Sequence, residues 1–116
     1  MKLLLLSQDL MLTARTEGVA RRLGLTLVSQ CNLVAAELDA CQLIVIDLTL
    51  PGLDLNSIVE QVRPVQIPIV ACAPHVHEAR LSQAREAGCD LVVSRGQWDR
   101  DAEKLCQELL ANFGEQ

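Results

Sequence analysis

Residues 43–54 constrain the fold more than any other part of this sequence. The segment opens with four consecutive β-favouring apolar residues, 43–46, and Asp47 follows them at once. An unbroken apolar run predicts a strand that is buried on both faces, because it leaves no side for water. A carboxylate is costly to bury without a partner. We therefore expect Asp47 to mark the point where the strand leaves the core and opens onto solvent.

A turn and a helix follow this strand. Pro51 and Gly52 favour a reversal of the chain, since proline presets one backbone angle and glycine permits the left-handed conformation. Apolar residues then recur at i, i+3, i+4 and i+7, which predicts one buried face of a helix. Asp54 is placed to cap this helix, and Pro64 follows its expected end. The apolar positions are Leu55, Ile58, Val59 and Val62.

The same reasoning divides the rest of the chain into alternating strands and helices. Apolar runs predict further strands at residues 3–6, 25–29, 67–72 and 91–93. Helical patterns lie at residues 10–23, 32–39 (capped by Asn32), 77–87 and from about 97 onward. Five strands alternating with five helices predict an α/β fold with a parallel, doubly wound sheet covered on both faces. In such a sheet the ligand site lies beyond the carboxyl ends of the strands.

Composition argues against several classes of partner. The 116 residues carry a net charge of -5, no basic stripe, one Phe, one Trp and no Tyr. We therefore expect neither a nucleic acid nor an anionic membrane as partner. No apolar run approaches membrane-spanning length, and the N-terminal leucines are too few for a signal peptide. The five scattered cysteines are expected to be reduced thiols in a cytoplasmic protein with one domain, residues 1–116.

Three segments, taken in their order and spacing, carry a resemblance to a known family. Residues 47–54 read D-L-T-L-P-G-L-D, residues 67–70 read I-P-I-V, and residues 86–90 read E-A-G-C-D. Over essentially its whole length the sequence resembles the receiver domain of bacterial response regulators. The resemblance implies a flavodoxin-like, five-stranded parallel sheet in the strand order 2-1-3-4-5. It also implies that Asp47 is the equivalent of the phosphoacceptor, in a two-component signalling module that is not an enzyme.

The other positions that a receiver uses are degenerate here. In the family, two adjacent carboxylates after the first strand join the phosphoacceptor in holding magnesium, which neutralises charge for the anionic phosphoryl donor. Asp9 comes one step too late for this role. The family's carboxylate pair, strand-four hydroxyl, aromatic switch and lysine correspond by alignment to Ser7, Gln8, Ala73, Val92 and Arg95. This pattern resembles pseudo-receivers, which keep the fold while metal-dependent phosphotransfer is lost or weakened.

Without magnesium, Asp47 needs another partner. Arg95 is the nearest candidate by topology, and its planar guanidinium can engage a carboxylate through two hydrogen bonds. We therefore predict an ion pair between Asp47 and Arg95 that holds the domain in one state.

The leading functional hypothesis is a receiver-like module that works by protein binding and needs no cofactor. It is expected to stand alone, because the sequence ends at Gln116 without an output domain. Its partner would be a histidine kinase, a phosphotransfer protein or an effector, and a homodimer is left open. The first helix, or the face of the fourth helix, fifth strand and fifth helix, would be the docking surface. The alternative is a genuine receiver phosphorylated on Asp47, with Asp9 recruited for magnesium.

A third hypothesis is a metal or thiol sensor. His75 and His77 lie near the same rim and could join Asp9 or Asp47 in binding a transition metal. Cys72 could act as a redox switch if its surroundings were exposed and electropositive. The only tryptophan, Trp98, has two interpretations, a core residue at the start of a helix or an exposed interface anchor. The two interpretations of Trp98 predict different exposure of its side chain, so the fold distinguishes them.

Overall fold

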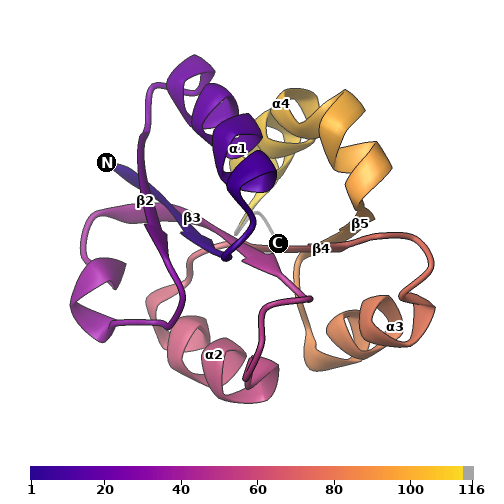
Figure 1. Cartoon of the computed structure of the whole chain (residues 1–116). Coiled ribbons are helices and arrows are strands. Elements are labelled where there is room, and N and C mark those ends of the chain that lie inside the picture. The colour runs from indigo at the N-terminus through magenta and orange to yellow at the C-terminus, as the bar shows by residue number, and fades with distance from the viewer. Residues whose placement is uncertain (114–116) are drawn as a thin grey trace.

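Five strands form one parallel sheet in the order β2-β1-β3-β4-β5, in a computed structural model that describes residues 1–113 (Figure 1). The predicted α/β class and strand order are confirmed. The last three positions of the expected domain, 114–116, lie outside the described residues. The strands are β1 (Lys2–Leu6), β2 (Thr26–Gln30), β3 (Cys41–Asp47), β4 (Ile69–Ala73) and β5 (Leu91–Ser94).

The central strand β3 separates two hydrophobic clusters. Leu43 and Val45 belong to the cluster on one face of the sheet, while Ile44 and Ile46 belong to the cluster on the other. This alternation follows from the two-residue period of a strand, which sends successive side chains to opposite faces. All four side chains are fully buried, as the unbroken apolar run predicts.

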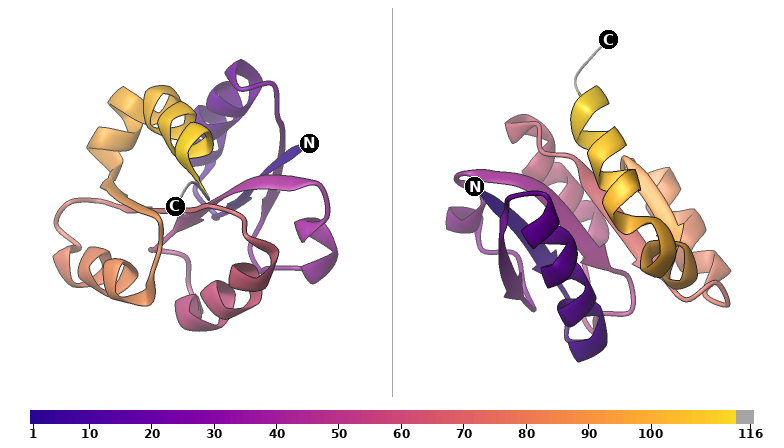
Figure 2. Two further views of the ribbon diagram at one scale, coloured as in Figure 1. Left: turned by 180° about the vertical axis from the view of Figure 1, so that it is seen from behind. Right: turned by 90° about the horizontal axis from the view of Figure 1, so that it is seen from above.

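Two pairs of helices cover the two faces. Helices α1 (Leu10–Arg22) and α4 (Arg95–Asn112) pack on one face, and α2 (Leu55–Val62) and α3 (Glu78–Ala87) pack on the other (Figures 1 and 2). The sequence placed α2 well: Asp54 caps it by accepting a hydrogen bond from Ser57 N, and it ends before Pro64. Helix α3 is held mainly by Leu81 and Ala84.

The structure has four α-helices in the described residues, and the second of the five predicted helices, at residues 32–39, is wrong. Residues 32–39 contain only a 3-10 helix, η1 (Ala35–Leu38), and Val34 rather than Asn32 precedes it. None of residues 35–38 is fully buried, and a short helix without a buried face is marginal in water. The segment therefore takes a more extended path. Leu33 and Leu38 attach this path to the core.

The last helix begins two residues earlier than predicted. Ser94 Oγ accepts a hydrogen bond from Gln97 N at 3.1 Å, so the hydroxyl caps a helix whose first residue is Arg95. Trp98, in the first turn, is 1 % exposed, which selects the core interpretation over the interface anchor. Within residues 1–113, no helix combines the length and the apolar character that crossing a membrane requires.

Candidate functional site

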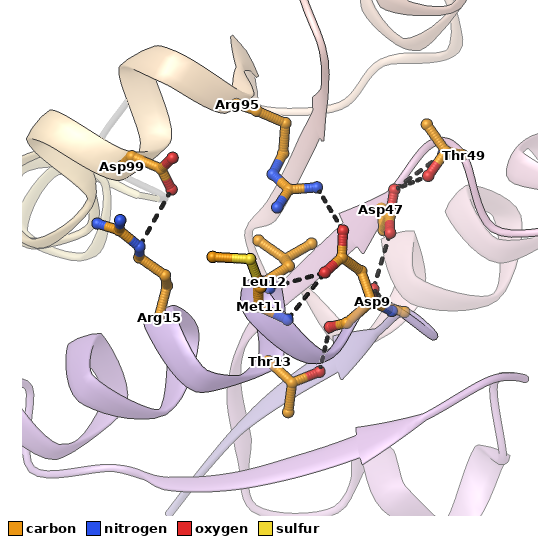
Figure 3. A network of polar contacts seen from close by, with 10 residues as sticks. Asp9, Met11, Leu12, Thr13, Arg15, Asp47, Thr49, Arg95 and Asp99 are labelled. Atoms are coloured by element: carbon orange, nitrogen blue, oxygen red, sulfur yellow. Dashed lines mark hydrogen bonds and ion pairs between the residues drawn. The ribbon is translucent and has the colours of Figure 1, made fainter.

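The carboxyl ends of β1, β3 and β5 bring together a small polar network (Figure 3). Ser7 and Asp9 follow β1, Asp47 ends β3 and Thr49 lies in the turn after it, while Arg95 opens α4 directly after β5. The sequence predicted that this edge holds the site, and all but Thr49 of these residues were predicted members.

Asp47 is a buried carboxylate, only 2 % exposed, so the prediction that it opens onto solvent is wrong. Its Oδ2 accepts a hydrogen bond from Ser7 Oγ at 2.7 Å. Its Oδ1 accepts two hydrogen bonds from Thr49, from the backbone N at 2.9 Å and from Oγ1 at 2.6 Å. These three donors replace the hydrogen bonds to water that the carboxylate loses, and so offset the free-energy cost of its burial. Both oxygens are therefore occupied by the protein itself.

Sheet register places Ser7 beside Asp47. Leu6 of β1 pairs with Ile46 of β3, so the next residue of each strand reaches the same level. Ser7 is 4 % exposed, and its Oγ also accepts a hydrogen bond from Asp9 N at 3.0 Å. The hydroxyl thus donates to one carboxylate and accepts from the backbone of the following turn, which fixes its orientation.

Asp9 has two structural roles that the sequence reading missed. Its Oδ1 caps α1 by accepting hydrogen bonds from Met11 N at 2.9 Å and Leu12 N at 3.1 Å. Its Oδ2 accepts a hydrogen bond from Arg95 Nη1 at 3.0 Å. The Leu12 amide and the Arg95 guanidinium lower the pKa of Asp9 below its usual value. The signal was present, because an Asp directly before a helical apolar pattern is a common N-cap.

The predicted ion pair between Asp47 and Arg95 is wrong, because Arg95 pairs with Asp9 instead. The donors from Ser7 and Thr49 already satisfy Asp47. Asp9 keeps one oxygen free of the helix cap, and that oxygen faces the first turn of α4. The guanidinium therefore joins the N-terminal ends of α1 and α4.

Two further contacts hold the turn after Asp47. Thr49 bends back onto the carboxylate, as described above, and Arg80 of α3 donates from Nη1 to the Leu48 carbonyl at 2.6 Å. The sequence reading assigned no role to Thr49 or Arg80. An Asp followed by Thr two residues later is typical of a side-chain turn, so Thr49 was detectable. Arg80 depends on the packing of α3 and left no local signal.

The residues of this edge do not fit a magnesium site. Magnesium prefers several oxygen ligands that are free to turn toward it, usually carboxylates and water. Here the position beside Asp47 is the hydroxyl of Ser7, Gln8 is exposed, and Asp9 is engaged by α1 and by Arg95. Ala73, the equivalent of the family's hydroxyl residue, is fully buried, and Val92 is half-buried.

The metal and thiol hypotheses gain no support from the geometry. Within residues 1–113, no three His, Cys, Asp or Glu side chains gather into a group that could hold a metal ion. The weak candidates Asp9, Asp47, His75 and His77 are thus not brought together as a ligand set. Burial raises the pKa of the Cys72 thiol to about 12, so it is neither exposed nor a ready thiolate.

Replacing Asp9 with Asn separates its two roles, because asparagine caps helices as well as aspartate does. The carboxylate is 39 % exposed, so losing the ion pair at neutral pH should cost at most about 1 kcal/mol of unfolding free energy. The folded-state pKa of Asp9 is lowered, so this stabilisation is complete above its usual pKa of 3.8 and disappears as pH falls through the folded pKa. Urea unfolding should therefore show wild type and Asp9→Asn converging in acid.

Asp9→Ala is the control for this experiment. It removes the cap as well as the ion pair, so it should be less stable than Asp9→Asn at every pH. A difference between wild type and Asp9→Asn that persists unchanged in acid would contradict the assignment.

Comparison with known proteins gives a likeness of fold. No protein family profile matches the sequence, and no curated protein matches it. The receiver domain of the TMAO respiratory system response regulator TorR superposes with a TM-score of 0.78 at 17 % identity, covering 97 % of this chain and 98 % of that one. A response regulator signal receiver domain from Bermanella marisrubri gives 0.76 at 20 % identity, covering 94 % and 97 %.

A longer protein shows the same likeness. Full-length FixJ from B. japonicum superposes with a TM-score of 0.76 at 16 % identity, over 98 % of this chain. The chain spans 59 % of the length of FixJ and nearly the full length of the two isolated receiver domains. The chain therefore has the fold of response regulator receiver domains.

Proposed function

We propose that this chain is a receiver-fold signalling module that acts by binding a protein partner and in which magnesium-dependent phosphorylation of Asp47 is impaired or absent. The observation that carries the proposal is the hydrogen bond from Ser7 Oγ to Asp47 Oδ2 at 2.7 Å. A neutral donor stands where a magnesium site would need a second carboxylate, and it engages one oxygen of the Asp47 carboxylate.

Charge supports the same proposal. An aspartate can attack an anionic phosphoryl donor only when nearby cations neutralise the developing charge. At this edge Arg95 is paired with Asp9 rather than directed at Asp47, and Arg80 donates to the Leu48 carbonyl. The two carboxylates thus accept hydrogen bonds from one guanidinium and five neutral donors. No cofactor is needed to hold this arrangement.

The proposed output is recognition of the domain surface in a single fixed state. In receivers a hydroxyl residue and an aromatic residue respond to phosphorylation. Ala73 and Val92 replace them here, so the side chains at those positions cannot respond to phosphorylation of Asp47 in the same way. A kinase, phosphotransfer protein or effector would then bind a surface whose conformation does not change. The two proposed surfaces are helix α1 and the face formed by α3, β5 and α4.

The test is incubation of the purified protein with acetyl phosphate and magnesium, followed by intact mass measurement. We expect no stable phosphoryl adduct on the wild type. Beryllofluoride with magnesium should likewise leave the amide spectrum of the site unchanged. Asp47→Asn is the control, because it removes the acceptor while keeping an amide that Ser7 and Thr49 can still contact. Labelling that disappears in Asp47→Asn would overturn the proposal and establish a phosphoacceptor.

A further inference from the structure

The edge strand β2 exposes backbone hydrogen-bonding groups that the described chain does not use. Thr26 N donates to the Met1 carbonyl, and the Gln30 carbonyl accepts from Ser7 N, so both residues face β1. Successive residues of a strand direct their backbone groups to opposite sides. The N–H and C=O groups of Leu27 and Ser29 therefore point away from the sheet. Within residues 1–113 these groups have no hydrogen-bond partner.

This edge also lacks the features that normally prevent strands from pairing. Natural edge strands carry charges, prolines, bulges or a covering helix. The β2 sequence T-L-V-S-Q has no charged residue and no proline, and its pairing with β1 runs without a bulge. The opposite edge differs, because β5 is shorter and packs against both α3 and α4, one on each face (Figures 1 and 2). Helix α1 packs on one face of β2, and on the other face Val28 belongs to the same cluster as Leu33 and Leu38.

We infer that β2 is a self-association surface, on which a second copy of this chain adds its own β2 in antiparallel orientation. A two-fold axis through Val28 makes the contact isologous, as closed dimers require. Leu27 then lies opposite Ser29 of the second copy, and each pair exchanges two N–H···O=C bonds. The two five-stranded sheets become one continuous sheet, and four backbone hydrogen bonds join them.

The charges beside the edge complement those of a second copy. Arg15 and Arg22 of α1 face α4, where they pair with Asp99 and Glu103. The 100° step of a helix places Glu17 and Arg21 on the flank of α1 away from α4. Figure 1 shows β2 on that side of α1. The two-fold axis sets the α1 helices of two copies antiparallel on one face. Within one chain Glu17 and Arg21 form an exposed ion pair at 3.4 Å, and the two-fold axis sets this pair opposite the same pair of the second copy, so that each charge can also meet its opposite there.

Interface size sets the expected strength. A pair of five-residue strands extends about 17 Å and buries less than the roughly 1,000 Å² of a stable interface, even with the α1 flanks added. The dimer is therefore dissociable, with a dissociation constant in the micromolar to millimolar range.

Sedimentation equilibrium over a concentration series tests this inference, with Ser29→Pro as the principal variant. The Ser29 side chain is exposed and its N–H points outward, so proline removes two intermolecular donors per dimer and no bond within the sheet. We expect the dissociation constant to rise roughly tenfold or more. Ser29→Lys, which puts a charge on the same edge, should weaken the dimer as well.

Two controls keep the outcome specific. Val92→Pro removes an outward N–H from the β5 edge, because the register pairs Leu91 with Val70 and so turns the backbone groups of Leu91 and Val93 toward β4, and it should leave the dimer unchanged. Thermal unfolding checks that each variant is folded. Amide exchange gives an independent readout: the Leu27 and Ser29 amides should be protected only at high concentration, and the Val28 amide at every concentration. A protein that stays monomeric, or a dimer lost in Val92→Pro but retained in Ser29→Pro, would overturn the inference.

Discussion

The double variant Ser7→Asp with Gln8→Asp is expected to gain a magnesium site that the wild type lacks. Adding two carboxylates beside Asp47 supplies the cluster of oxygen ligands that magnesium prefers. Without metal, the variant should be less stable than wild type, because a carboxylate at position 7 repels the buried Asp47 that Ser7 now satisfies. With metal, that repulsion becomes attraction to a shared cation.

Thermal unfolding with and without magnesium measures this gain. At a magnesium concentration ten times the dissociation constant, binding should stabilise the variant by about 1.4 kcal/mol. For a domain of this size that corresponds to an increase in the unfolding temperature of roughly 4–8 °C. The wild type should not respond. The matched control is Ser7→Asn with Gln8→Asn, which has a similar shape without the charge. A wild-type response equal to that of the aspartate variant would show that the native edge already binds the ion.

Removing a single hydroxyl should have the second largest effect. Ser7→Ala leaves Asp47 buried with Thr49 as its remaining donor and deprives one carboxylate oxygen of its partner. Hydrogen bonds to charged groups contribute about 1.5–3 kcal/mol, so the unfolding free energy should fall by that amount at neutral pH. Urea unfolding with a constant m-value measures the loss.

Two comparisons show whether the loss belongs to Asp47. Ser57→Ala is the control for removing a hydroxyl, since Ser57 Oγ accepts only an exposed hydrogen bond from Gln61 and should cost little. Combining Ser7→Ala with Asp47→Asn tests coupling between the two residues. The Ser7 hydroxyl should matter less once the carboxylate is an amide. Equal costs of Ser7→Ala in both backgrounds would contradict the proposed role of the hydroxyl.

The self-association inference and the proposed function can fail independently. Pairing through β2 involves the edge of the sheet farthest from β5 and uses none of the residues that bind Asp47. If the protein is monomeric and acetyl phosphate does not label it, the proposed function stands and the inferred interface is wrong. If it dimerises through β2 and is phosphorylated on Asp47, the interface stands and the proposed function is wrong.

The sequence by itself determined the features that depend on neighbours along the chain. Unbroken apolar runs identified the buried strands, because a strand with no polar alternation must be covered on both faces. The cap at Asp54 and the left-handed conformation of Gly52 were equally local, and the structure confirms them. The motif at residues 47–54 correctly indicated the fold, which the solved receiver structures share.

Local patterns failed where burial overrode them. The pattern at residues 32–39 suggested a helix, but the segment has no fully buried residue at positions 35–38 and forms only a 3-10 turn. Asp47 was expected to be exposed because a carboxylate is costly to bury without a partner. Thr49, close in sequence, supplies two of its three hydrogen bonds, and Ser7 supplies the third. Burial of Asp47 became possible only when the ends of β1 and β3 met.

Only the tertiary structure decided which charges and donors meet at the candidate site. Ser7 and Asp47 are 40 residues apart in sequence, and Asp9 and Arg95 are 86 apart. Sheet register sets the first contact, and the starting points of α1 and α4 set the second. Electrostatics allowed Arg95 to pair with either aspartate, and the choice followed from which carboxylate oxygen was left without a donor. That is a property of the assembled edge, and composition and spacing do not contain it.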